Sequence, residues 1–241
     1  MRSVTRTLFT IGLYQVLAAA CAHAQPVTGE IISHIYLPAT QEPSAQHLRR
    51  LQLPDGFKIE KFASGLGAPR MLAVADDGTV YVTRTEAGDV LMLRDSNGDG
   101  KADKQKEVVK QPQVHGIAIH ANKMYLATVK AVYVADMHEG GMLGELQTII
   151  NDLPIGGQHS NRTIAFGPDG MLYVTVGSPC DMCVPTDQKS ATVLRVDPTS
   201  GQQTVFASGL RNTLGFGWQP KTKEMWGMDN GMDWLGDVQQ G

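Results

Sequence analysis

The chain has 241 residues, of which 42% are hydrophobic and 19% are charged, and its formal net charge is −3. This composition is ordinary for a soluble globular protein, and the length suits one large domain or two small ones. The net negative charge argues against a nucleic-acid-binding protein, which needs a basic face.

The first 24 residues have the features of a secretory signal peptide. A basic start with Arg2 and Arg6 is followed by an apolar run of 13 residues, Leu8–Ala20, and by an A-x-A cleavage motif, Ala22–Ala24. The run is too short to span a membrane. We therefore expect a chain that is exported to the periplasm or secreted.

Cys21 also allows a lipoprotein reading of this segment, but Ala18 stands where such signals usually have Leu. A cleaved signal is therefore the preferred interpretation. Cleavage after Ala24 would leave 19 basic and 24 acidic residues, a net charge of −5.

Residues 25–54 contain four prolines and little regular periodicity, so we expect an extended leader on the outside of the domain. From residue 55 onward the chain is repetitive. The phrase FASGL occurs at Phe62–Leu66 and again at Phe206–Leu210, 144 residues apart, which is three times 48. An aromatic residue recurs at intervals of 44, 48 and 53 residues, at Tyr81, Tyr125, Tyr173 and Trp226.

A repeat of this length, made of short strands and Gly-rich turns, predicts an all-β chain folded as a β-propeller over residues 55–241. In the first blade, Phe57–Leu66 is expected to be a strand, and a hairpin is expected to turn at Asp76–Gly78. The strands expected in the later blades lie in HGIAIH, MYLATV and AVYVAD, then RTIAFGPDGMLYVTVG and VLRVDPTSGQQTVFASGL, then LGFGWQPKTKEMWGMD. No long 3.6-residue period occurs, so little helix is expected.

Residues 56–241 hold about four blades of this length. A closed four-bladed propeller is possible, but a six-bladed propeller of which four blades are present fits the sequence better. An unclosed propeller would leave an unpaired strand edge, which favours aggregation or pairing with another polypeptide.

Two cysteines follow the signal segment, Cys180 and Cys183, in the sequence CDMC. Haem attachment would require His after the second Cys, where Val184 stands, and zinc would require two further ligands that are not evident. In an exported protein, a small disulfide that closes a loop is the expected structure.

Basic residues and histidines come directly before the first strand of each expected blade. Because a propeller places these positions around the mouth of one channel, their donors would converge on a pocket for an anionic, planar ligand. The alternative is that each side chain only satisfies carbonyl groups of a neighbouring blade. These residues are Arg70, His115, His159, Arg162, Arg211 and Asn212.

Three stretches of the chain resemble the glucose/sorbosone dehydrogenases. They are GQHSNRTIAFGPDGMLYVTVGSPCDMC, FASGLRNTLGFGW and DNGMDWLGD, and the resemblance runs from about Leu53 to the C-terminus. Members of this family are exported six-bladed propellers that use pyrroloquinoline quinone (PQQ) and calcium. The resemblance therefore implies both cofactors, a small sugar substrate and an external electron acceptor.

The resemblance also implies a role for each matching residue. His159 corresponds to the family's general base, and Arg211 and Asn212 correspond to the pair that contacts the quinone oxygens. Arg162 corresponds to an Arg near that His, with a spacing one residue shorter. The loop with Gly231 and Met232 corresponds to the one whose carbonyls bind calcium. The family's last two blades, which supply further cofactor contacts, have no counterpart in this sequence.

A second calcium candidate is the stretch from Asp95 to Asp103, which begins like an EF-hand loop. Asp95, Asn97 and Asp99 occupy its first, third and fifth positions, but Lys106 stands where the bidentate Glu belongs. The alternative is an Asx-rich turn that joins two strands.

Two other functions compete with the quinoprotein dehydrogenase. One is a calcium-dependent propeller lactonase, which would need carboxylates around the channel, where this sequence has Arg and His. The other is a non-catalytic propeller fragment, which failure to melt cooperatively would indicate.

Overall fold

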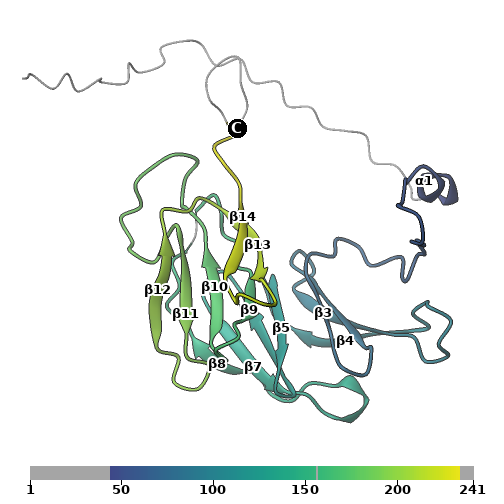
Figure 1. Ribbon diagram of the computed structural model, residues 1–241. Helices are drawn as coiled ribbons and strands as arrows, with labels where there is room; N and C mark the ends of the chain where they lie inside the picture. The colour runs from purple at the N-terminus through teal and green to yellow at the C-terminus, as the bar shows by residue number, and fades with distance from the viewer. Residues whose placement is uncertain (1–43, 156, 234–241) are drawn as a thin grey trace, which may run out of the picture.

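The computed structural model describes residues 44–155 and 157–233, which form an almost entirely β structure (Figure 1). The signal sequence expected at residues 1–24 lies outside the described residues. Three sheets have four antiparallel strands each, and a fourth sheet is a two-stranded hairpin. In every sheet the strands neighbour one another in the order in which the chain forms them.

Each sheet is formed by consecutive strands from one continuous stretch of the chain. The first sheet contains β1 (Leu72–Val74), β2 (Val80–Arg84), β3 (Asp89–Arg94) and β4 (Lys104–Lys110). The second contains β5 (Gly116–His120), β6 (Lys123–Ala127), β7 (Val132–Asp136) and β8 (Gln147–Ile150). The third contains β9 (Ile164–Phe166), β10 (Leu172–Val176), β11 (Thr192–Val196) and β12 (Gln203–Ser208), and the hairpin is β13 (Thr213–Trp218) with β14 (Met225–Asp229).

The first strands of the sheets lie side by side. Strand β1 contacts β5, and β5 contacts β9; the hairpin strand β13 contacts β10, the second strand of the third sheet. Sheets that follow one another in this way, each with its first strand innermost, are the blades of a β-propeller. The predicted fold is therefore confirmed, and the described residues provide three complete blades and the first hairpin of a fourth.

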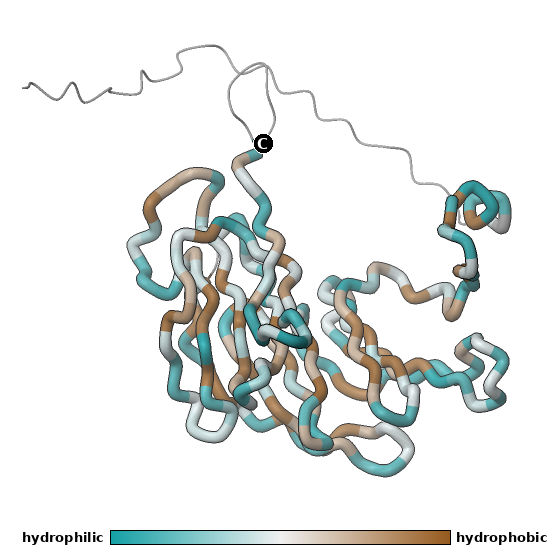
Figure 2. The backbone as a smooth tube through the Cα atoms, viewed as in Figure 1, coloured by the Kyte–Doolittle hydropathy of each residue, from teal (hydrophilic) through white to brown (hydrophobic). Residues whose placement is uncertain are grey.

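The core lies between successive blades. Tyr81 and Met92 of the first blade pack with Ile117 and Met124 of the second, and all four are buried. A second cluster joins the second and third blades through residues such as Leu172. Figure 2 shows hydrophobic residues concentrated along the strands, with hydrophilic residues at the turns. Burial on both faces of the middle strands is what holds a blade between its neighbours.

The turns that the sequence predicted are present. In the β1–β2 turn, Asp77 Oδ1 accepts a hydrogen bond from the backbone N–H of Thr79 at 3.0 Å, and Gly78 has φ of 81°. In the β9–β10 turn, Asp169 Oδ1 accepts from Met171 N at 3.2 Å. These Asx contacts stabilise the tight reversal between two strands.

The strand predicted at Phe57–Leu66 is wrong, because no strand is assigned there. Phe57 is 70% exposed. The later part of this segment still packs on the first blade, where Phe62 and Leu66 contact Leu91 and its buried neighbours. Phe62 O also accepts a hydrogen bond from Ala102 N at 2.8 Å, just before β4, but the described segment is not part of a ladder.

Part of the leader predicted to be extended lies outside the described residues, and its described part, residues 44–54, contains a short helix. Ala45–Arg49 form a five-residue helix, α1, which lies clear of the sheets (Figure 1). The only other helical segment within the described ranges is a single 3₁₀ turn, Glu139–Gly141. Neither of these is long and apolar enough to cross a membrane.

Candidate functional site

Five of the six residues predicted to line the channel mouth lie within two residues of an inner strand, and His159 lies five residues before β9. Arg70 precedes β1, His115 directly precedes β5, and Arg162 lies two residues before β9. Arg211 and Asn212 directly precede β13. The structure thus brings together at one end of the blades the positions that the sequence placed there.

His159 is held in one orientation by its own blade. Its Nδ1 atom lies 2.8 Å from the backbone carbonyl oxygen of Ser178, in the loop that follows β10. A carbonyl can only accept a hydrogen bond, so Nδ1 carries the proton and the lone pair of the neutral ring lies on Nε2. A Cβ added at Gly177 would lie 2.5 Å from the His159 Cβ, so only glycine allows this close approach.

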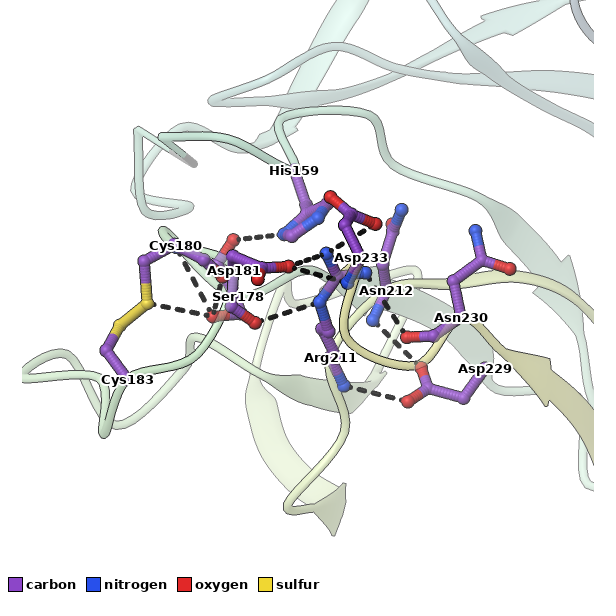
Figure 3. A network of polar contacts seen from close by, with 10 residues as sticks. All are labelled: His159, Ser178, Cys180, Asp181, Cys183, Arg211, Asn212, Asp229, Asn230 and Asp233. Atoms are coloured by element: carbon purple, nitrogen blue, oxygen red, sulfur yellow. Dashed lines mark hydrogen bonds and ion pairs between the residues drawn. A yellow bond between two sulfur atoms is a disulfide. The ribbon is translucent and has the colours of Figure 1, made fainter. Parts of the chain in front are cut away.

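The Arg211 guanidinium is fixed by the loop that follows β10 and by the loop that follows β14. Its Nε donates to the carbonyl oxygen of Asp181 at 2.9 Å, and its Nη2 donates to the Asp181 carboxylate (Figure 3). Asp233 Oδ1 lies 3.0 Å from the same Nη2. Burial alone would lower the pKa of Arg211, but its bond to Asp181 and the charge of Asp233 outweigh this effect and raise it.

Asp229 at the end of β14 holds the backbone of the Arg211–Asn212 turn. Its Oδ2 accepts from Arg211 N and its Oδ1 from Asn212 N, both at 2.9 Å. Thr213 Oγ donates to the same Oδ1 at 2.7 Å. Gly231 and Met232, the predicted calcium-binding residues, follow two and three positions later, so their loop starts from this anchored point.

Arg162 is fully buried, and its side chain is occupied by backbone carbonyls. Nη1 donates to His159 O at 3.0 Å and Nη2 to Pro154 O at 2.8 Å, whereas Nε has no partner within the described part of the chain. Burial lowers the pKa of Arg162 to about 10, so the side chain still carries its charge at neutral pH. For Arg162, these contacts agree with the alternative interpretation, in which the side chain satisfies backbone carbonyl groups.

His115 is also buried, whereas Arg70 is exposed. His115 Nδ1 lies 2.9 Å from the carbonyl oxygen of Arg162 in the next blade, so Nδ1 is again the donor. Burial lowers the pKa of His115, and the charges of Arg70 and Arg162 lower it further, against the opposing effect of this hydrogen bond.

Together these contacts form one hydrogen-bonded chain across all four sheets. Thr83 Oγ donates to His115 O at 2.8 Å, His115 to Arg162 O, and Arg162 to His159 O. His159 in turn donates to Ser178 O, and Ser178 N donates to Arg211 O at 2.7 Å. The residues that precede the inner strands therefore form a connected network rather than a set of independent side chains.

Cys180 and Cys183 form the predicted disulfide, which lies beside this network (Figure 3). Asp181 stands between the two cysteines. Ser178 Oγ donates to the carbonyl oxygen of Cys180 at 2.8 Å. The disulfide loop is thus tied to the residue whose carbonyl orients His159.

The stretch from Asp95 to Asp103 forms a loop closed by its own carboxylates. Asp95 accepts from the backbone N–H groups of Gly98 at 2.7 Å and of Gly100 at 2.8 Å, and these bonds lower its pKa. Asn97 and Asp99 cap the following residues in the same way. Over the described ranges, no group of three or more His, Cys, Asp or Glu side chains is placed to hold a metal ion. The contacts match the Asx-rich turn.

The sequence reasoning missed three residues of the site. Asp181 and Asp233, which hold the Arg211 side chain, were singled out by no pattern. Asp229 lies in the resembling stretch DNGMDWLGD, but its role in binding the turn before β13 was not predicted. Their positions in the sequence could have indicated them, because all three carboxylates lie next to residues already assigned to the site.

Successive antiparallel sheets, with a tethered His159 and an anchored Arg211–Asn212 turn before their inner strands, define a β-propeller protein with a polar cluster among the described residues. The profile of the TrAA12-like family matches residues 51–240, and the chain belongs to this family. This membership confirms the resemblance to the PQQ-dependent sugar dehydrogenases that the motifs indicated.

Solved structures share the fold at low sequence identity. The holo PQQ domain of pyranose dehydrogenase from Coprinopsis cinerea has 21% identity and a TM-score of 0.66, over 76% of this chain and 48% of that one. A family AA12 carbohydrate-active enzyme from Trichoderma reesei has 23% identity and a TM-score of 0.67, over 77% and 52%. The PQQ-bound aldose sugar dehydrogenase from Streptomyces coelicolor has 24% identity and a TM-score of 0.60, over 73% and 60%.

A curated relative from Borreliella burgdorferi, described as an uncharacterized protein, is 25% identical over 222 residues. The match covers 86% of this chain and 57% of the relative. The chain thus spans about half the length of the proteins that it resembles.

Proposed function

We propose that this chain forms the part of a quinoprotein dehydrogenase that carries the general base and one side of the cofactor site. The protein would oxidise an aldose or a related sugar alcohol with transfer of hydride to PQQ. The observation that carries the proposal is the pairing of His159, with its lone pair on Nε2, and the Arg211–Asn212 turn at the next inner strand. An external electron acceptor would then reoxidise the cofactor.

His159 acts as the general base in this proposal. Its Nε2 accepts the proton of the substrate hydroxyl while hydride leaves the same carbon. The Nδ1–H bond to Ser178 O fixes the ring and stabilises the positive charge that the imidazole gains. General base catalysis of this kind contributes about 10²–10⁴ in rate.

The donors around the mouth fit an anionic, oxygen-rich ligand. In this proposal Arg211 and Asn212 would hold the quinone oxygens, and Arg70 and His115, which precede the inner strands β1 and β5, would add further donors. When bound, PQQ supplies the hydride acceptor and calcium acts as a Lewis acid. Arg162 has a different role in this proposal, because its guanidinium is spent on carbonyl groups: it supports the loop that carries His159.

Calcium is proposed at the loop after β14, through the backbone carbonyls of Gly231 and Met232. The anchoring of Asp229 supports this assignment, because it fixes the start of the loop beside Arg211. For Asp95, Asn97 and Asp99 calcium binding remains a prediction, and the observed contacts favour a structural turn. Export to the periplasm or outside the cell is also proposed, and the disulfide supports it because such bonds persist in oxidising compartments.

The test is a titration of the purified chain with PQQ, once in calcium and once in excess chelator. Saturable quenching of tryptophan fluorescence is expected in calcium, with Trp218 and Trp226 among the reporters. Arg211→Ala should weaken binding by about tenfold or more, because it removes charge-assisted hydrogen bonds. His159→Ala should retain binding but lose about 10²–10⁴ of the sugar oxidation rate with a dye acceptor.

His47→Ala is the matched control, since His47 lies in α1, away from the blades. It should change neither binding nor rate. A cooperatively folded protein that does not bind PQQ would refute the quinoprotein assignment. No observed contact favours the lactonase over it.

A further inference from the structure

Asp181 has contacts that set it apart from the other exposed carboxylates of this face. Its carbonyl oxygen accepts Arg211 Nε at 2.9 Å, and its Oδ1 accepts Arg211 Nη2. The same Oδ1 accepts the backbone N–H of Asp233 at 3.1 Å. One residue therefore binds the guanidinium at two points and also binds the loop that follows β14, as Figure 3 shows.

This two-point contact fixes the direction of a long side chain. An arginine loses rotamer entropy when it is held, so a guanidinium that must meet a ligand in one geometry benefits from acceptors already in place. The Arg211 side chain is only 11% exposed, and that of Asp181 is 32% exposed. The pair is thus shielded more than an ordinary surface ion pair, whose contribution is small.

The loop that carries Asp181 is itself constrained. The disulfide between Cys180 and Cys183 closes a ring that contains Asp181, and Ser178 Oγ binds the carbonyl of Cys180. Ser178 also accepts the hydrogen bond of His159 and donates from its N–H to Arg211 O. The short segment from Ser178 to Asp181 therefore contacts both His159, the proposed base, and Arg211, which is proposed to bind the cofactor.

We propose that Asp181 is a positioning residue for Arg211, and that the Cys180–Cys183 disulfide holds Asp181 where it can perform this role. The inference rests on the proposed function in one respect, because the ligand presented to Arg211 is taken to be PQQ. The affinity for PQQ should then depend on a carboxylate and a disulfide that do not themselves touch the cofactor.

The first measurement does not depend on the cofactor. Phenylglyoxal modifies accessible, unrestrained arginines, and the modification of Arg211 can be followed by peptide mass spectrometry. Asp181→Ala should raise the rate at Arg211 several-fold, and the double variant Cys180→Ser/Cys183→Ser should raise it in the same direction. Asp187→Ala is the matched control, because Asp187 lies in the same loop but its side chain contacts only the backbone of its own turn.

The second measurement is the PQQ titration in calcium. Asp181→Ala should weaken binding by about tenfold, the scale of one charge-assisted hydrogen bond. In an Arg211→Ala background the same substitution should have no further effect, which a merely structural role would not produce. Melting temperatures of all variants establish that each remains folded.

The outcomes separate the two proposals. Two results would overturn the positioning role. One is unchanged reactivity of Arg211 in Asp181→Ala, and the other is additive losses of PQQ affinity when Asp181→Ala and Arg211→Ala are combined. If the parent chain binds no PQQ while Arg211 reactivity rises in Asp181→Ala, the positioning role stands and the cofactor assignment fails.

Discussion

At the scale of single residues, the site is built from side chains that bind backbone carbonyls. Both His115 and His159 use Nδ1 in this way, which leaves Nε2 as the acceptor in each neutral ring. Arg162 is a buried charge without a carboxylate partner among the described residues, and carbonyl dipoles take the place of one. The role of each residue in the site therefore depends on where its side chain points as well as on its residue type.

The buried His115 gives a prediction for the pH dependence of stability. Its pKa is lowered by burial and by the charges of Arg70 and Arg162, so the folded state binds its proton less readily than the unfolded state does. The unfolded state therefore gains protons first as the pH falls through about 6.5, and stability falls with it. The contribution of this residue to the free energy of unfolding should therefore be smaller at pH 5.5 than at pH 7.5.

Urea unfolding at the two pH values measures this effect. His115→Asn keeps a donor near the position of Nδ1 but does not titrate, so its stability should depend less on pH than that of the parent chain. His47→Asn, which replaces a histidine of α1, should keep the parent slope. Equal slopes in the parent chain and His115→Asn would contradict the assignment.

At the scale of elements, the inner strands approach one another closely at their first residues. A Cβ at Gly116, the start of β5, would lie 2.6 Å from the carbonyl oxygen of Arg162 and 3.2 Å from a side-chain carbon of Ile164. These are backbone and core atoms that cannot move aside without cost. The same Arg162 carbonyl oxygen accepts the hydrogen bond of His115, so it takes part both in the packing of β5 and in the polar network.

Gly116→Ala should therefore destabilise the protein by about 1–3 kcal/mol, the usual cost of overpacking. The measurement is the free energy of unfolding from urea titration. Gly215→Ala in β13 is the control, because an added Cβ there has no heavy atom within 4 Å. Comparable losses at the two positions would show that the close approach of β5 to Arg162 does not matter.

The strands that sequence reasoning left unassigned are β3, β4 and β8. Strand β4, KQKEVVK, is largely exposed and rich in Lys, so it lacks the alternation that marks a half-buried strand. Lysines are common on such edges because they discourage pairing with other chains. Strand β3 is a short apolar run, buried over most of its length, and periodicity alone does not separate it from other buried segments.

At the scale of the whole molecule, the blades are unequal. The first three sheets have four strands, whereas β14 pairs only with β13 among the described residues. Trp226 is 69% exposed and Met228 is 74% exposed on this hairpin. The hairpin carries Arg211, Asn212 and Asp229 at its open end, so the proposed cofactor ligands lie on the sheet with the fewest strands.

Native-state hydrogen exchange should show this difference. Among the described residues β14 has one flanking strand and no buried side chain, whereas β10 is buried along its whole length. Amides of β14 are therefore expected to exchange at least about tenfold faster than those of β10. PQQ binding should slow exchange in the hairpin if the proposed function is right. Equal protection of β10 and β14 in the free chain would contradict the prediction.

The sequence by itself determined the propeller fold, the turns and the positions of the inner strands. These follow from local patterns: the recurring aromatic lies in the second strand of every sheet, and the Asp–Gly turns reverse the chain at Gly78 and Gly170. A repeat then places His115, His159 and Arg211 at one end, because equivalent positions in successive blades share a face. The family resemblance added their expected roles.

Only the tertiary structure decided what each side chain contacts. Arg162 and Arg211 occupy similar positions in the repeat, yet the first points into the interior and binds carbonyls, whereas the second is held by Asp181 and Asp233. No strand forms at the predicted Phe57–Leu66, where Phe62 has a backbone hydrogen bond to Ala102 but no ladder follows. Side-chain direction and strand pairing depend on residues distant in sequence, and a local pattern does not contain them.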